Sequence, residues 1–513
     1  MHTPILLVDY YKLGHRPQYP PGTEYVYSTW TGRKSLVPGI NYTVAFGLQH
    51  FIKKYLIDGF NDNFFHRPLS EVIDEYERIV MNTLGIQPDH EHLIDLWNLG
   101  YLPLKIKALP EGTIVPIGVP WITIENTHPK FFWLTNYIES LMSAELWQAT
   151  TSATIANEFY KTFSTWAKKT NPEQLGFVDF QGHDFAFRGM SSVESAALSG
   201  MGHLLSFKGT DTITGIMEAE DYYGANVEKE LIGTSVPATE HSVMCAGGPG
   251  AGELETYRRL ITDVYPKGIV SIVSDTWDLW HVITQTLGRD LHDVIMERDG
   301  KVVVRPDSGD PVDIMCGTDY EPDFHRYGCP GGTPEQKGVI ELLWDFFGGT
   351  ISSTGYKVLD PHIGAIYGDG ETLERVDETC SRLERKGFAS TNWVAGIGSF
   401  TYQRQTRDSF GHAMKATDVV INGEEIAIFK DPVTDTSKMK KSQTGRVAVL
   451  EHDGSYKFLD RLNRSGFHPH GGFISKDADC LQTVFLNGAP TKFQTFSEIR
   501  ARLASERSLS TAG

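Results

Sequence analysis

The sequence predicts an α/β protein whose central part repeats βαβ units and whose two ends form a β-rich second domain. Three observations support this prediction. Between residues 268 and 395, apolar runs of strand length alternate with stretches of helical periodicity. Short alternating runs divided by turns precede this part, and an Asn-Gly hairpin signal follows it. The composition is that of a globular chain, with 40% hydrophobic and 22% charged residues among 513.

The central part repeats the order strand, helix, strand. We expect strands at 268–273, 302–304, 364–367 and 393–395, and helices at 279–297, 335–347 and 371–386. Continuous β-branched runs are typical of strands that are buried on both faces. The pattern fits either an α/β barrel or a doubly wound sheet.

The two ends of the chain carry antiparallel signals. Short strands are expected at 104–109, 113–117 and 121–124, a hairpin at 419–428, and helices at 48–56, 71–84 and 132–167. We therefore expect a β-rich domain made of residues 1–178 plus 411–513, and a βαβ domain made of residues 179–410.

Charge and cysteine usage exclude several classes of protein. The net charge of −18 makes nucleic acid and anionic membranes poor partners. The apolar run at residues 4–8 is too short for a signal peptide or a membrane span, so we expect a cytoplasmic protein. Five scattered cysteines lack the spacing of a zinc or redox motif and are expected to be reduced.

The strand expected at 302–304 runs directly into Arg305 and, two residues later, Asp307. The carboxyl end of a parallel strand is where α/β proteins bind their ligands. Arg305 can form a fork of hydrogen bonds to phosphate oxygens, and Asp307 can bind Mg²⁺ or ribose hydroxyls. A charged turn that only ends the strand is the alternative interpretation.

A second candidate lies where Gly368, Asp369 and Gly370 follow an expected strand and precede an expected helix. Main-chain N–H groups and the positive end of the helix dipole suit a phosphate at such a position. A plain turn is again the alternative.

A third candidate is Arg188, which follows the aromatic residue Phe185 and precedes an expected helix. Ser191 and Glu194 predict a capping box at the start of that helix. The aromatic neighbours of Arg188 also suit a flat ring held by stacking. His241 lies in no nucleophile or metal motif, so the residues around it favour a structural role.

Several segments, in a fixed order over nearly the whole chain, carry a family resemblance. They are 9–12 with His15, 18–21, 185–192, 207–212, 236–242, 304–311, 368–370, 406–408 and 429–433. On these segments the chain resembles the nicotinamide phosphoribosyltransferases, which are type II phosphoribosyltransferases. The resemblance implies an irregular α/β barrel core with a β-rich second domain formed by both chain termini. It also implies a homodimer with shared active sites.

The activity that the resemblance implies joins nicotinamide to phosphoribosyl pyrophosphate with Mg²⁺. The products are nicotinamide mononucleotide and pyrophosphate, the salvage step toward NAD. His241 matches a histidine that ATP phosphorylates, so ATP is expected as a coupling substrate. Arg305 and Asp307 are expected to take part in catalysis with His241, and Asp307 and Asp275 to hold the Mg²⁺.

Substrate-binding roles follow from the same resemblance. Phe185, together with Tyr11 of the partner subunit, would stack on the pyridine ring, and Asp211 would accept a hydrogen bond from the carboxamide. The resemblance also places four residues near the substrates: Asp9, Arg188, Ser271 and Asp275. It implies that the 5′-phosphate is bound by Gly368, Asp369 and Gly398. Positive charge near the phosphates is expected from Arg33, Arg407, Lys415 and Lys430.

Two alternatives stay open at this stage. A nicotinate phosphoribosyltransferase shares the fold and the cosubstrate, but Asp211 argues against it because a substrate carboxylate would face a like charge. A noncatalytic binding protein on the same fold is the other alternative. The intact Arg188, Asp211, His241, Arg305 and Asp307 argue against that class.

Overall fold

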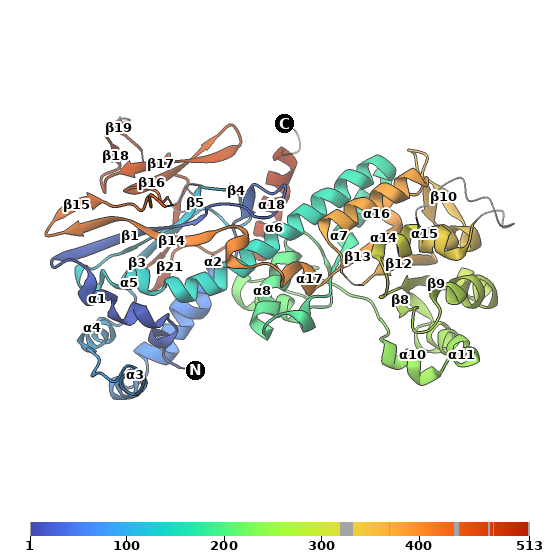
Figure 1. Ribbon diagram of the computed structural model, residues 1–513, viewed down its shortest axis with the longest axis horizontal. Coiled ribbons are helices and arrows are strands. Elements are labelled where there is room, and N and C mark those ends of the chain that lie inside the picture. Colours follow the sequence, from blue (N-terminus) through green and yellow to red (C-terminus); the bar gives the residue numbers. More distant parts are fainter. Residues whose placement is uncertain are drawn as a thin grey trace. The chain divides into compact units, whose positions relative to one another are not determined.

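Figure 1 shows a computed structural model of the chain, which describes residues 2–318, 332–368, 370–434, 441–469, 472–475 and 477–510. The chain divides into two compact units. The first comprises Met1–Thr154, Glu218–Asn226 and Gln405–Gly513. The second comprises Ile155–Met217 and Val227–Arg404.

The second unit is built on a six-stranded parallel sheet. In sheet order its strands are β7 (Gly209–Thr210), β6 (Gly182–Asp184), β13 (Trp393–Ile397), β12 (Ile363–Tyr367), β9 (Asp299–Arg305) and β8 (Lys267–Val273). Four of these strands lie where the sequence predicts them, whereas β6 and β7 are too short to leave a periodic signal. β12 is buried along its whole length, as its apolar sequence indicates.

One stretch of main chain bonds to both edges of this sheet. Thr210 N donates a hydrogen bond to Thr234 O at 2.9 Å, beside the edge strand β7. Ser271 N in β8, the other edge strand, donates to Pro237 O at 2.9 Å. Residues 234–239 therefore link the two edge strands of the sheet through hydrogen bonds.

Helices cover the strands of the second unit (Figure 1). They are α7 (Val178–Gln181), α8 (Val193–Leu204), α10 (His241–Gly247), α11 (Ala251–Arg259), α12 (Leu279–His281), α13 (His292–Met296), α14 (Pro311–Cys316), α15 (Pro334–Phe347), α16 (Leu373–Arg385) and α17 (Ser399–Tyr402). The Ser192 hydroxyl caps α8 by accepting from Ser195 N at 3.0 Å. The capping box expected at Ser191 is therefore wrong by one residue, because Ser192 is the residue in extended conformation there.

The first unit contains a seven-stranded antiparallel sheet drawn from both ends of the chain. In sheet order its strands are β15 (Glu424–Ala427), β14 (His412–Ile421), β1 (Thr23–Gly32), β5 (Pro120–Asn126), β3 (Leu104–Ala108), β20 (Gln482–Leu486) and β21 (Ala489–Pro490). Asn422 and Gly423, both with positive φ, form the turn between β14 and β15, as the Asn-Gly signal predicts. The prediction that both ends share a sheet is confirmed.

One strand pairing in the first unit differs from the prediction. β3 and β5 are neighbours, but β4 (Ile114–Pro116) pairs with β2 (Tyr42–Val44) in a separate two-stranded ladder. Three short runs in succession suggested one sheet, and only the tertiary fold chooses the distant partner. Two more hairpins pair β16 (Arg446–His452) with β17 (Ser455–Leu462), and β18 (Phe467–His468) with β19 (Gly472–Phe473).

The helices of the first unit include the expected ones. They are α1 (His15–Gln18), α2 (Leu48–Phe51), which continues as a helix to Gly59, α3 (Leu69–Leu84), α4 (Glu91–Leu99), α5 (Leu134–Tyr137) and α18 (Phe496–Ser510). Trp30, Trp121 and Phe51 are among the fully buried side chains of this unit. Burial of such large apolar side chains is the dominant favourable term in its folding.

The unit boundaries differ from the expected domain boundaries at three places: the first segment of the first unit ends at residue 154 and not 178, its last segment begins at residue 405 and not 411, and it also includes residues 218–226. α6 (Glu139–Thr170) is one continuous helix that runs from the first unit into the second, where Phe163 packs on Phe207 and Trp393. Residues 218–226, at the end of α9 (Ile213–Tyr223), belong to the first unit because Tyr223 stacks on Phe46. Long-range packing of this kind leaves no local mark in the sequence.

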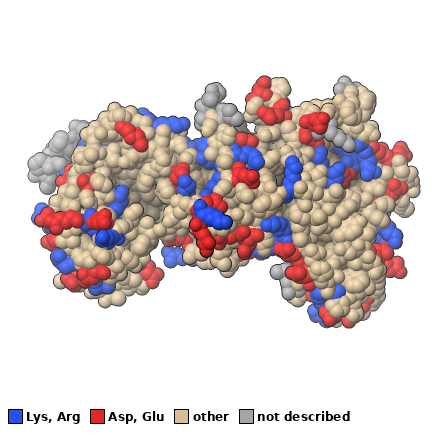
Figure 2. Space-filling view, turned by 180° about the vertical axis from the view of Figure 1, so that it is seen from behind, with Lys and Arg blue, Asp and Glu red and all other residues tan. Residues whose placement is uncertain are grey.

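Charges of both signs are interspersed on the face shown in Figure 2, where Lys and Arg groups lie next to Asp and Glu. That face presents no broad basic area of the kind that binds nucleic acid. In the part of the chain that the structure describes, no helix is both long enough and apolar enough to cross a membrane.

Candidate active site

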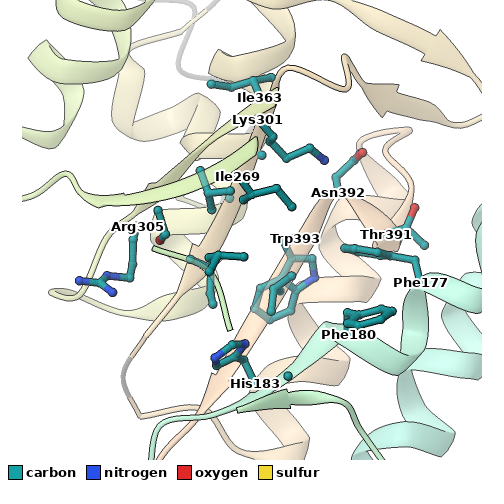
Figure 3. A pocket seen from close by; sticks show the side chains of 18 of the residues that line it. Phe177, Phe180, His183, Ile269, Lys301, Arg305, Ile363, Thr391, Asn392 and Trp393 are labelled. Atoms are coloured by element: carbon teal, nitrogen blue, oxygen red, sulfur yellow. The ribbon is translucent and has the colours of Figure 1, made fainter. Parts of the chain in front are cut away.

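The second unit contains a cavity of about 730 Å³, and part of the predicted site lies along its wall (Figure 3). The carboxyl ends of parallel strands meet at one edge of a sheet, so loops distant in sequence converge there. Phe185 follows β6 and donates from its N–H to Ile397 O at the end of β13, at 3.0 Å. Four predicted residues line the cavity: Phe185, Asp211, Ser271 and Arg305.

Asp211 is held by two side chains at a single carboxylate oxygen. His183 Nε2 lies 2.9 Å and Ser235 Oγ 2.5 Å from Asp211 Oδ1. Burial acts to raise the pKa of Asp211, but the His183 and Ser235 hydrogen bonds and the positive charge of Arg305 hold it below its ordinary value. Asp211 is thus an ionised acceptor, and its second carboxylate oxygen has no hydrogen-bond partner among the described residues.

The Phe185 ring is packed against main chain on one side. A Cβ atom added to Gly396 would lie 2.4 Å from Phe185 Cδ2, so only glycine fits behind the ring. The His183 ring contacts Phe185 with centroids 4.8 Å apart, at an interplanar angle of 49°. The close backing fixes the orientation of the Phe185 ring, which suits stacking of a flat ligand ring.

His241, Asp275 and Asp307 form a second group of polar side chains. His241 Nε2 lies 3.9 Å from Asp275 Oδ1 and 3.7 Å from Asp307 Oδ2. Asp275 Oδ2 accepts from Asp307 N at 2.8 Å and from Ser308 Oγ at 2.6 Å. Asp275 Oδ1 is buried and accepts no hydrogen bond from the described residues. The structure therefore brings both predicted carboxylates to the predicted histidine.

Two arginines add positive charge to this edge of the sheet. Arg305 donates a hydrogen bond to Thr239 O. Burial lowers the pKa of Arg305, and the negative charges of Asp307 and Asp211 partly offset this lowering. Arg188 is exposed in a short helical turn after β6, and its charge acts on Arg305. An anion placed between the two guanidinium groups would relieve their repulsion.

The glycine positions differ in what surrounds them. A Cβ atom on Gly368 would lie 3.1 Å from Asp307 Oδ1, so the loop after β12 lies close to the carboxylate group. Gly398 precedes α17 and has open space where its side chain would be. Asp369, also expected to bind phosphate, lies outside the described residues.

Six predicted residues lie in the first unit. Lys415 and Lys12 flank Glu139, with Lys415 Nζ 4.0 Å from Glu139 Oε1. Burial lowers the pKa of Lys415, and the negative charge of Glu139 opposes this lowering. The positive charges of three other residues lower the pKa further: Arg33, Lys430 and Lys12. The structure therefore places Arg33, Lys415 and Lys430 in one basic cluster.

The other three predicted residues of the first unit are Tyr11, Asp9 and Arg407, and the Tyr11 ring centroid lies 5.3 Å from Lys12 Nζ. Tyr11 is 61% exposed and meets His15 edge to face, with ring centroids 4.9 Å apart. Asp9 accepts from Ser140 Oγ at 2.5 Å. The side chain of Arg407 lies 3.6 Å from that of its neighbour Asp408.

Known proteins resemble this chain over its whole length. The family model described as "Nicotinate phosphoribosyltransferase (NAPRTase) family" matches residues 180–486, and "Nicotinamide phosphoribosyltransferase, N-terminal domain" matches residues 4–106. A nicotinamide phosphoribosyltransferase from Acinetobacter baylyi is 47% identical, with 98% of this chain and 97% of the relative covered. The chain belongs to the nicotinamide phosphoribosyltransferase family. A second member, from Xanthomonas campestris pv. campestris, is 32% identical over 98% of both chains.

Two solved structures share the fold at 16% sequence identity. Nicotinate-nucleotide pyrophosphorylase from Pyrococcus furiosus gives a TM-score of 0.56, with 98% of this chain and 95% of that chain covered. Human nicotinic acid phosphoribosyltransferase gives 0.54, with 98% and 94% covered. The mixed α/β architecture with a parallel and an antiparallel sheet is thus common to proteins of distant sequence.

Sequence reasoning did not single out three residues of this site: His183, Ser235 and Gly396. His183 precedes Phe185 by two positions, so both side chains lie on the same side of the chain leaving β6. That spacing was the available signal for His183. Ser235 reaches Asp211 from a distant segment, and Gly396 meets the Phe185 ring only in the folded chain, so neither could be assigned before folding.

Proposed function

We propose that the chain transfers the phosphoribosyl group of phosphoribosyl pyrophosphate to nicotinamide, giving nicotinamide mononucleotide and pyrophosphate in NAD salvage. Asp211, ionised and fixed by His183 and Ser235 beside the Phe185 ring, is the observation that carries the choice of nicotinamide. The membership in a family of nicotinamide phosphoribosyltransferases supports the reaction.

Base selection follows from the charge of Asp211. The carboxamide N–H of nicotinamide donates to a carboxylate that can only accept, because Asp211 keeps its proton off over the working pH range. The carboxylate of nicotinate has no N–H and meets a like charge at the same place. Phe185, with Tyr11 of the partner subunit on the opposite ring face, stacks on the pyridine ring and directs its nitrogen.

The transfer needs no general base. The pyridine nitrogen already carries a free electron pair, which forms the bond to ribose C1 while the bond from C1 to the pyrophosphate oxygen breaks. Arg305 and Arg188 bind the departing pyrophosphate, whose negative charge grows in the transition state. Gly368, Asp369 and Gly398 bind the 5′-phosphate, and Ser271 and Asp275 support the pocket. Catalysis is by positioning and charge stabilisation.

The carboxylates fit the Mg²⁺ that the resemblance implies. No group of three His, Cys, Asp or Glu side chains that could hold a metal occurs in the described part of the chain. Mg²⁺ bound with substrate phosphates needs only one or two carboxylates, and Asp275 Oδ1 is buried with no hydrogen-bond donor from the described residues. Asp275 and Asp307 would hold the ion, which supplies charge neutralisation to the pyrophosphate.

His241 is proposed as the residue that ATP phosphorylates. Its side chain is 47% exposed, and carboxylates at 3.7 and 3.9 Å stabilise a positive imidazole during phosphoryl transfer. The imidazole nitrogen would form a bond to the γ-phosphorus as the bond to the ADP oxygen breaks. Hydrolysis of the phosphohistidine then drives the equilibrium toward the mononucleotide.

The proposal extends to assembly, shape and location. A homodimer would bring Tyr11 to the site of the other subunit, together with some of the positive charge of Arg33, Arg407, Lys415 and Lys430. The bridging of β7 and β8 by residues 234–239 supports an irregular α/β barrel in the second unit. A cytoplasmic location accords with the substrates.

The deciding experiment measures product formation from nicotinamide and from nicotinate in parallel, each with phosphoribosyl pyrophosphate and Mg²⁺, with and without ATP. We expect turnover of nicotinamide and little of nicotinate. A preference for nicotinate, the activity named in the family model for residues 180–486, would overturn the role of Asp211. Turnover of neither base would support the noncatalytic alternative.

A further inference from the structure

Asp184 is a buried carboxyl group that the proposed mechanism does not use. It is the last residue of β6, directly before Phe185, and its side chain is fully buried. Successive side chains of a strand point to opposite faces of a sheet, so His183 and Asp184 face different sides. His183 lines the cavity (Figure 3), whereas Asp184 is not among the described residues that line it. Asp184 therefore acts on the site from behind, without touching a ligand in the cavity.

Asp184 holds the main chain at both residues that are assigned to nicotinamide. Its side-chain Oδ1 accepts a hydrogen bond from Ala186 N at 2.8 Å, which closes a turn around Phe185. Its main-chain oxygen accepts from Asp211 N at 2.9 Å, beyond the end of β7. One buried residue thus connects the turn that carries the stacking ring to the loop that carries the carboxylate.

The turn alone does not require a negative charge at this position. An asparagine would accept the same hydrogen bond from Ala186 N, because Asn and Asp form the same side-chain turns. Burial raises the pKa of Asp184 to about 6, against the hydrogen bond from Ala186 N, the Thr212 side chain and His183, while Asp211 raises it further. The pKa in the unfolded chain is about 3.9, so the ionised form of Asp184 costs stability at neutral pH. The charge is therefore unfavourable for folding, and its use lies elsewhere.

The charge of Asp184 adds to that of Asp211. Three titratable side chains of the described residues act on Asp184 or are acted on by it: His183, Asp211 and Tyr402. Burial and the charge of Asp184 raise the pKa of Tyr402 well above its ordinary value, and the neutral Tyr402 hydroxyl lies 2.7 Å from His203 Nδ1. Asp211 stays ionised below its ordinary pKa. Two negative charges at neutral pH thus act on the place where the substituent of the pyridine ring lies, and buried surroundings screen them weakly.

We propose that Asp184 is a positioning and specificity-determining residue: its side chain fixes the turn that carries Phe185, and its negative charge reinforces Asp211 in rejecting a substrate carboxylate. The same charge favours the carboxamide N–H of nicotinamide, whose positive end points toward Asp211. The inference rests on the proposed function, because it concerns the choice between two bases at the same site. It differs from the role of Asp211 in that Asp184 acts without contact.

The test compares steady-state kcat/KM for nicotinamide and nicotinate in the full-length wild type and in Asp184→Asn at pH 8. We expect the ratio of nicotinate to nicotinamide to rise at least about threefold, the effect of a charge that acts at a distance rather than in contact. Asp184→Asn should unfold at no lower temperature than the wild type, since it removes a costly buried charge. Asp418→Asn is the matched control, because Asp418 is a buried carboxyl group of β14 whose pKa burial raises to about 7, and it should leave the ratio unchanged.

The pH dependence of the ratio separates this role from a merely structural one. As the pH falls from 8 to 5.5, Asp184 of the wild type binds a proton near pH 6 while Asp211 stays ionised, so the ratio should rise. This rise should be smaller in Asp184→Asn, which has no carboxyl group to titrate. Thr212→Val removes a side chain that lowers the pKa of Asp184, so the midpoint of the rise should move to higher pH.

Each outcome decides one of the two proposals. An unchanged ratio in Asp184→Asn, or the same pH profile in Asp184→Asn and the wild type, overturns the role of Asp184. If Asp184→Asn does not fold, Thr212→Val decides, and an unshifted midpoint overturns the role. Turnover of nicotinamide by the wild type with an unchanged ratio in Asp184→Asn refutes this inference alone. Turnover of neither base by the wild type refutes the proposed function, and this inference with it.

Discussion

Replacing Asp211 by Asn tests the basis of base selection most directly. A nicotinate carboxylate at about 4 Å from Asp211 would be repelled by about 4 kcal/mol at an effective dielectric constant near 20. The Asp211 side chain is 44% exposed, so solvent screening reduces this to roughly 2 kcal/mol, or about 30-fold in rate. Asp211→Asn removes the repulsion, whereas the loss of a charged acceptor should lower kcat/KM for nicotinamide about tenfold.

The assay is steady-state kcat/KM for both bases, with folding checked by thermal unfolding. We expect the ratio of nicotinate to nicotinamide to rise by at least about 30-fold. Asp299→Asn, the same change at an 84% exposed carboxylate at the start of β9, should leave the ratio unchanged. A ratio that stays at the wild-type value in Asp211→Asn would refute the electrostatic argument, since no other acidic side chain among the described residues lines the cavity.

Three further predictions concern other parts of the molecule. His241→Ala should abolish stimulation by ATP and leave basal transfer measurable; equal stimulation in the variant would rule out phosphorylation at this residue. Gly396→Ala should raise KM for nicotinamide about tenfold, because its Cβ would lie 2.4 Å from Phe185 Cδ2. Gly176→Ala, in open space, is the control. An unchanged KM in Gly396→Ala would show that the Phe185 ring is not held in place by Gly396. Burial lowers the pKa of His412 to about 3 in the folded protein, whereas in the unfolded chain it is near 6.5. As the pH falls from 7 to 5, only the unfolded state therefore binds a proton at His412, and the free energy of unfolding falls by about 2 kcal/mol. In urea unfolding, the free energy of unfolding of His412→Phe should fall by about 2 kcal/mol less than that of the wild type over the same pH range. An equal fall in both proteins would contradict the lowered pKa of His412.

The sequence alone determined much of the local structure. Apolar runs marked β8, β9 and β12, of which β12 alone is buried along its whole length, whereas β8 begins with three exposed residues and burial alternates at the end of β9. Asn422 and Gly423 marked their turn through the positive φ that they tolerate. The order of motifs along the chain determined the family, which local physics could not have supplied.

Only the tertiary structure decided which distant residues meet. His183 and Ser235 converge on one oxygen of Asp211, and residues 234–239 join the two edges of the parallel sheet, through contacts between segments with no shared pattern. The close approach of Gly396 to the Phe185 ring exists only in the folded chain. Such features depend on which side chains are brought together by packing, and the local chain contains no record of its partners.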